Sequence, residues 1–286
     1  MLWQRVVTAV VLLLLLLPAL FYHSPEPFSA VAMVFVVAGA WEWARLCAMG
    51  RGGCLALAAV CAALCAAAWQ AGWLIAPLTG LWLVAAAVWL FGGAWLLYGG
   101  VSAWLALPRV LRLTIGLGVL TVAWIAVAQA RTIGINYLLS VLVLVWAADI
   151  FAYFSGRAWG GRILARKLAP SISPGKSWEG VWGGMVGVLV LALVWVWADG
   201  HWRMVVPSLF TRLYELGLWP MLAAVVLLCA LSVVGDLSES LLKRAAGVKD
   251  SSGLLPGHGG VLDRLDALLP TLPVAMLMYS LWSVAA

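Results

Sequence analysis

The sequence predicts an all-α integral membrane protein that crosses the bilayer about nine times. Of its 286 residues, 65% are hydrophobic and only 10% are charged, whereas soluble domains are about half apolar and about a quarter charged. Trp, which gathers at membrane–water interfaces, occurs 19 times. No polar stretch is long enough to form a soluble domain, so we expect the whole chain to fold in the membrane and at its surfaces.

Nine segments have the length and composition of a membrane-spanning helix, which needs about 20 mainly apolar residues. They cover residues 6–22, 28–47, 54–75, 78–98, 110–130, 135–155, 181–198, 216–234 and 268–285. Strands of a membrane β-barrel would be about ten residues long and strictly alternating, so we expect helices throughout. The first segment begins after the basic residue Arg5, as a signal peptide would. It lacks a small-residue cleavage site, and we expect it to remain as an anchor.

The distribution of Lys and Arg predicts the topology, because both residues accumulate in cytoplasmic loops. With a cytoplasmic N-terminus, nine alternating spans leave only three of the 17 Lys and Arg residues outside, namely Arg131, Arg203 and Arg212. The C-terminus is then on the outer side. Both large polar loops, residues 156–180 and 235–265, then face the cytoplasm. The net charge of +6 therefore reflects topology, and we expect no binding to nucleic acid.

Five of the 11 acidic residues follow the eighth span, at Asp236, Glu239, Asp250, Asp263 and Asp266. If the eighth helix continues past residue 234, steps of three or four residues place one set of polar side chains on one face. This set is Asp236, Glu239, Ser240, Lys243 and Arg244. Such a face suits either a phosphate-handling site or an amphipathic helix at the membrane surface, with Glu239 and Lys243 as an ion pair.

The next element is the glycine-rich stretch 253–260, GLLPGHGG. Glycine lets the backbone approach a ligand closely, and exposed backbone N–H groups in such loops bind phosphate oxygens. A plain turn between two helices is the alternative. Asp263 and Asp266 follow on one helix face and suit Mg²⁺, which prefers hard oxygen ligands. Their alternative role is a capping and ion-pair cluster with Arg264.

The polar helix face, the glycine-rich stretch and the pair of aspartates, taken in this order, resemble the signature of a known family. Residues 240–266, SLLKRAAGVKDSSGLLPGHGGVLDRLD, resemble the signature of the phosphatidate cytidylyltransferases without a departure from it. The resemblance implies that CTP and phosphatidic acid react to CDP-diacylglycerol and pyrophosphate. It also implies an Mg²⁺ ion held by Asp236 and Asp263, and it leaves open a second, monovalent cation. A homodimer in a bacterial inner membrane is implied as well.

The other large polar loop adds to the resemblance. Residues 173–180, SPGKSWEG, match the family's pattern S-P-x-K-S-x-E-G. Within it, Lys176 is a point charge of the kind that phosphate sites use. Asp149 lies in the sixth span, and an ionisable residue there is expected to be functional or to pair with a basic residue such as Arg157.

The expected site combines both loops. Residues expected to act on the reacting phosphates are Asp236, Lys243, Arg244, Lys249, Asp250, His258, Asp263, Arg264 and Asp266. Residues expected to bind substrate are Ser173, Lys176, Ser177, Glu179, Ser240, Gly259 and Gly260. For His258, a structural hydrogen bond is the alternative. We expect the five spans of residues 1–134 to support a catalytic part at residues 135–286. Glu42, an acid inside the second span, is expected to pair with Arg45.

Other classes of membrane protein remain as alternatives. A transporter of a phosphorylated metabolite would explain the spans and the buried acids, but not the 27-residue string at 240–266. A lipid-linked kinase that uses CTP, such as a prenol or diacylglycerol kinase, is a second alternative. A CDP-alcohol phosphotransferase is disfavoured, because its DG-x2-AR…G…D-x3-D motif is missing.

Overall fold

The computed structural model describes residues 2–164 and 166–285. Within them, nine helices are long and apolar enough to cross a membrane: Trp3–Phe21, Glu26–Leu46, Arg51–Gln70, Thr79–Ala106, Arg109–Ile133, Ile135–Trp159, Trp178–His201, Leu218–Ala245 and Leu262–Ser283. The nine predicted spans are therefore confirmed, and no strand forms among the described residues. The chain is an all-α, multi-pass membrane protein. Which of its ends faces the cytoplasm stays a prediction.

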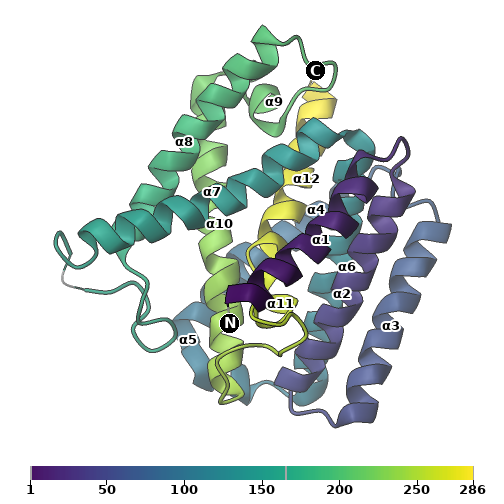
Figure 1. The fold of residues 1–286 in the computed structure, drawn as a ribbon, viewed down its shortest axis with the longest axis vertical. Coiled ribbons are helices and arrows are strands. Elements are labelled where there is room, and N and C mark those ends of the chain that lie inside the picture. Colours follow the sequence, from purple (N-terminus) through teal and green to yellow (C-terminus); the bar gives the residue numbers. More distant parts are fainter. Residues whose placement is uncertain (1, 165, 286) are drawn as a thin grey trace.

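Every spanning segment is helical because the bilayer offers no water to bond a free backbone N–H or C=O. The regular helices are α1 (Leu2–Phe21), α2 (Glu26–Leu46), α3 (Arg51–Gln70), α6 (Arg109–Ile133), α7 (Ile135–Trp159), α8 (Trp178–His201), α10 (Leu218–Ala245) and α12 (Leu268–Ala285). Two short helices, α9 (Leu209–Glu215) and α11 (Leu262–Leu265), were not expected as separate elements. In Figure 1, α1, α2 and α3 stand side by side, away from α8 and α9.

The fourth span is longer and less regular than its predicted range of 78–98. It consists of α4 (Thr79–Ala87), a π-helical turn η1 (Val88–Gly92) and α5 (Gly93–Ala106). Inside α5, Gly100 has a φ of 66°, a left-handed conformation that glycine adopts at little cost. A Cβ added at Gly93 would lie 2.8 Å from Val234 Cγ1. The absence of a side chain there lets this span pack closely against α10.

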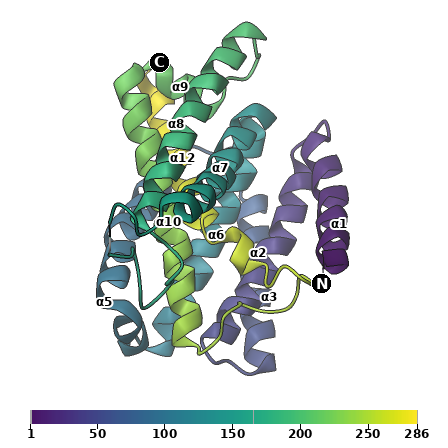
Figure 2. The same cartoon turned by 60° about the vertical axis from the view of Figure 1, so that its left-hand side comes forward.

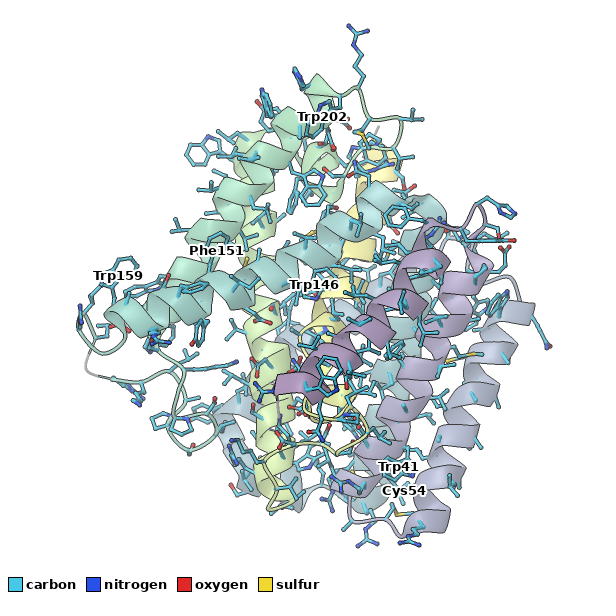
Figure 3. The ribbon with its side chains drawn as sticks, viewed as in Figure 1. Trp41, Cys54, Trp146, Phe151, Trp159 and Trp202 are labelled. Atoms are coloured by element: carbon cyan, nitrogen blue, oxygen red, sulfur yellow. The ribbon has the colours of Figure 1, made fainter. Side chains whose placement is uncertain are left out.

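Helices α7 and α8 form a closely packed hairpin that carries the first polar loop. A Cβ added at Gly184 would lie 2.9 Å from the carbonyl oxygen of Ala148, and small residues allow membrane helices to approach this closely. Figure 3 places Trp159 at the end of α7, beside the first polar loop, and Trp202 just past the end of α8, at the other end of the hairpin. Both side chains are exposed, and aromatic residues at both ends suit a hairpin that reaches the two membrane surfaces.

The N-terminal helix lies against the segment between α10 and α11. Arg5 Nε donates to the carbonyl oxygen of Gly257 at 2.9 Å, and Thr8 Oγ1 donates to that of Pro256 at 2.9 Å. Figure 2 shows this segment passing beside the start of α1. The first span is thus bonded to the middle of the glycine-rich stretch, 252 residues further along the chain.

Candidate active site

The candidate site begins on α10, which does continue past residue 234 and ends at Ala245. Lys243 Nζ forms the ion pair with Glu239 that belonged to the alternative of an amphipathic helix, and a second one with Asp263 Oδ1 at 2.6 Å. One turn before Glu239, Asp236 accepts a long hydrogen bond of 3.4 Å from Ser240 Oγ. Lys243 therefore ties α10 to the start of the last span.

Asp263 is enclosed by donors from its own segment. Its Oδ2 atom accepts hydrogen bonds from Gly260 N at 2.7 Å, Ser251 Oγ at 3.0 Å and Ser251 N at 3.1 Å. Only 10% of its side chain is exposed. The alternative pairing of Asp263 with Arg264 does not occur, because Arg264 Nη2 instead donates to the carbonyl oxygen of His258 at 2.6 Å.

The two polar loops meet across α10. Lys176, from the first loop, forms an ion pair with Asp236. Further along α10, Arg244 Nε donates to the carbonyl oxygen of Ile172 at 3.1 Å. The sequence predicted both loops on one face of the membrane, and these contacts hold the two loops together at one end of the bundle.

A cavity of about 420 Å³ opens between α7, α8, α10 and the first polar loop. Four of its charged lining residues are Asp149 and Asp236, which bring carboxylates, and Lys176 and Arg157, which bring cations. Ser177 also lines it, and its Oγ caps α8 by accepting a hydrogen bond from Gly180 N. Asp149 does not pair with Arg157, whose Nη1 donates to Tyr153 Oη at 3.1 Å. Both Asp149 and Arg157 are therefore available to the cavity.

The carboxylates of the cavity are the candidate ligands of a divalent cation. Among the described residues, no group of three or more His, Cys, Asp or Glu side chains is placed to hold a metal ion. Asp149 and Asp236 nevertheless line the same cavity, and Mg²⁺ in phosphate sites often uses only one or two carboxylates with substrate phosphates and water. Hard oxygen donors at Asp236 and Asp149 thus fit such an ion. At Asp263, Lys243 and three further donors already occupy the carboxylate.

Comparisons with known proteins decide the family. A model of the cytidylyltransferase family matches residues 3–282. The chain belongs to the cytidylyltransferase family. A Pseudomonas aeruginosa protein named phosphatidate cytidylyltransferase is 40% identical over 280 residues, which cover 96% of this chain and 95% of that protein. A protein of the same name from Haemophilus influenzae is 35% identical, over 98% of this chain and 99% of that protein. Another from Brucella abortus is 37% identical, over 69% of this chain and 74% of that protein. As a member of this enzyme family, the chain is a nucleotidyltransferase.

Five further expected site residues are not among those that line the cavity. Lys249 and Asp250 are exposed beyond the end of α10. Gly259 has a φ of 85° in the turn that leads to Asp263. Asp266 Oδ1 accepts a hydrogen bond from Ala267 N at 2.7 Å. Ser173 lies in a turn, where its N–H donates to the carbonyl oxygen of Ala169 at 2.8 Å.

Glu179, expected among the substrate-binding residues, instead supports the first loop. Its Oε1 atom accepts hydrogen bonds from the backbone N–H groups of Gly161 at 3.2 Å, Ile163 at 3.1 Å and Leu164 at 2.9 Å. The side chain is buried and is not among the residues that line the 420 Å³ cavity. Glu179 thus shapes the loop that carries Lys176.

Glu179→Ala is expected to release these three N–H groups and to speed amide hydrogen exchange at residues 161–164 by at least about tenfold, because a hydrogen bond to a charged group contributes about 1.5–3 kcal/mol. Hydrogen exchange with mass spectrometry on the purified protein measures this. Glu179→Gln keeps an acceptor oxygen and is the matched control, expected to retain protection. Equal protection in the wild type and Glu179→Ala would contradict this role.

The sequence-based pairing of Glu42 with Arg45 is wrong. Arg45 Nε donates to the carbonyl oxygen of Ser251 at 3.0 Å, while the Glu42 carboxylate accepts hydrogen bonds from Ser251, Ser252, Val261 and Leu262. Glu42 and Arg45 of α2 therefore both bond to the signature segment and not to each other. An acid inside an apolar span indicated that Glu42 has a special role, but the sequence could not show its partner, because Ser251 lies 209 positions further along the chain.

Proposed function

We propose that this chain transfers the cytidylyl group of CTP to phosphatidic acid, with CDP-diacylglycerol and pyrophosphate as products. The observation that carries the proposal is the meeting of both polar loops at a charged cavity between membrane helices, through Lys176 and Asp236. A lipid phosphate can enter such a cavity while its acyl chains stay in the bilayer. The printed names of the relatives, which match nearly the whole chain, support the same reaction.

The chemistry asks for positioning and charge neutralisation. An oxygen of the phosphatidate phosphate attacks the α-phosphorus of CTP in line, the new P–O bond forms, and the bond to the leaving pyrophosphate breaks. The attacking phosphate is already ionised near neutral pH, so the step requires no general base. Lys176 and Arg157, which line the cavity, neutralise phosphate charge and orient the reactants.

The proposal includes Mg²⁺, for which the family resemblance implies Asp236 and Asp263 as ligands, while the cavity itself offers Asp236 and Asp149. When bound, the ion would neutralise the phosphate oxygens of CTP and assist the departure of pyrophosphate. The Asp236 carboxylate is 29% exposed and lines the cavity with Asp149, and it would accept the ion in place of Lys176. Asp263 becomes available only when Lys243 moves away from it.

Three further proposals complete the assignment. The protein resides in the inner membrane of a bacterium, as its bacterial relatives suggest. Both polar loops face the cytoplasm, where CTP is made, as the Lys and Arg distribution predicts. The working unit is a homodimer, as the family resemblance implies.

The reaction is tested with purified protein in detergent or vesicles. We expect pyrophosphate to be released from CTP only when phosphatidic acid is present, with an equal amount of CDP-diacylglycerol formed. Parallel reactions with ATP, UTP and dCTP, and with diacylglycerol or a prenol as acceptor, separate this activity from a lipid kinase. Phosphorylation of an acceptor lipid, or the absence of any lipid-dependent pyrophosphate, would overturn the proposal.

A further inference from the structure

Glu42 is a fully buried acid in the second span, with 0% of the residue exposed. Its Oε1 atom accepts hydrogen bonds from Val261 N at 2.9 Å and from Ser252 Oγ; its Oε2 atom accepts them from Leu262 N at 2.6 Å and Ser251 Oγ at 3.1 Å. No Lys or Arg forms an ion pair with it among the described residues. An unpaired buried charge is costly unless hydrogen bonds compensate it, so these four donors account for its place in the membrane.

The four donors come from both ends of one loop. Ser251 and Ser252 precede the glycine-rich stretch 253–260, and Val261 and Leu262 follow it. A single carboxylate therefore closes this stretch at its two ends and fixes it to α2. The fit is close, because a Cβ added at Gly260 would overlap both Ser251 Oγ and the Glu42 carboxylate.

The closed loop also sets the place of Asp263. Ser251 Oγ lies 3.1 Å from Glu42 Oε2 and 3.0 Å from Asp263 Oδ2, so the single proton of this hydroxyl is shared between two carboxylates. Gly260 N and Ser251 N, the backbone donors to Asp263, adjoin Val261 and Ser252, which bond to Glu42. A shift of either loop end would move the donors that surround Asp263.

We infer that Glu42 is a positioning residue for the reaction: from α2 it clamps both ends of the 253–260 loop and thereby fixes the environment of Asp263. This inference rests on the proposed function, because it concerns the rate of that reaction. The role requires an acceptor-only group. The two oxygens of a carboxylate can accept hydrogen bonds from all four donors. A glutamine amide has only one oxygen, and its NH₂ group would face two of the donors without being able to accept from them.

The decisive variant is Glu42→Gln, assayed as the full-length purified protein with CTP and phosphatidic acid. We expect kcat to fall between about tenfold and about 100-fold, the range for the loss of one or two hydrogen bonds to a charged group. The KM for phosphatidic acid should change less than about threefold, because the substitution removes no interaction that binds the substrate equally in the ground state and in the transition state. In parallel, amide exchange at residues 251–262 should accelerate while exchange in α7 and α8 stays unchanged.

Glu215→Gln is the matched control, since Glu215 is an exposed acid whose Oε2 accepts a hydrogen bond from Trp282 Nε1 elsewhere in the fold. We expect it to leave kcat and loop exchange as in the wild type. If Glu42→Gln does not fold, Ser252→Ala removes one donor and keeps the carboxylate. We then expect kcat to fall about threefold to tenfold, with an unchanged melting temperature.

The possible results separate the alternatives. A variant that melts earlier but keeps the wild-type kcat per folded molecule would show a purely structural role and overturn the inference, as would unchanged exchange at 251–262. A wild type that releases no lipid-dependent pyrophosphate overturns the proposed function instead. In that case, exchange at 251–262 still decides whether Glu42 clamps the loop.

Discussion

Asp236→Asn is expected to lower CDP-diacylglycerol formation by at least about 100-fold, or about 2.7 kcal/mol of transition-state stabilisation. The substitution keeps the shape of the side chain and removes its charge. Asp236 lines the cavity with Asp149, and its carboxylate, which is 29% exposed, would exchange its ion pair with Lys176 for the cation. Initial rates over a range of Mg²⁺ concentrations measure the effect, and excess Mg²⁺ should not restore the wild-type rate.

A second variant distinguishes a metal ligand from a simple partner of Lys176. If Asp236 serves only to pair with Lys176, then the double variant Asp236→Asn with Lys176→Met removes both charges and should recover activity. We expect no recovery, because both side chains face the reacting phosphates. Glu215→Gln again serves as the matched acid-to-amide control. A double variant with near-wild-type turnover would refute the assignment of Asp236 to the proposed metal site.

The sequence was sufficient for the features that depend on neighbouring residues. Nine apolar stretches of spanning length predicted nine helices, because the hydrophobic thickness of the bilayer sets the length of each one. A helical spacing of three or four residues also indicated that α10 could continue past residue 234, and with it the ion pair of Glu239 with Lys243 that was one of two alternatives. These features require no knowledge of how distant segments meet.

Features that depend on distant segments were missed. Glu42 and Arg45 stand three residues apart, which favoured a local ion pair, yet each bonds instead to the segment after α10. Glu179 lies in a motif that implied substrate binding, yet its oxygen accepts three backbone hydrogen bonds from the preceding loop. In both cases, a buried carboxylate needs hydrogen-bond donors, but which donors lie next to it depends on how distant segments of the chain pack together.

The second large effect concerns Asp263, for which we expect Asp263→Asn to lower turnover by at least about 100-fold and also to loosen the loop. Unlike Asp236, Asp263 accepts two backbone N–H groups, a hydroxyl and Lys243. An Asn amide would present its own N–H groups to at least one of these donors. Lys243 would keep only Glu239 as its acidic partner. Two separate causes of inactivity are therefore expected in this one variant.

The two aspartates can be separated by comparing activity with amide exchange. Asp236→Asn should lose activity while residues 251–262 exchange as in the wild type, because within the described part of the chain Asp236 contacts Ser240 and Lys176 and makes no hydrogen bond to that segment. Asp263→Asn should lose activity and protection together, as Glu42→Gln does to a smaller extent. If Asp263→Asn kept both loop protection and near-normal turnover, neither the proposed metal site nor the enclosure of Asp263 would matter for the reaction. Loss of activity with full protection would instead favour direct contact of Asp263 with the metal ion or the substrate over its structural role.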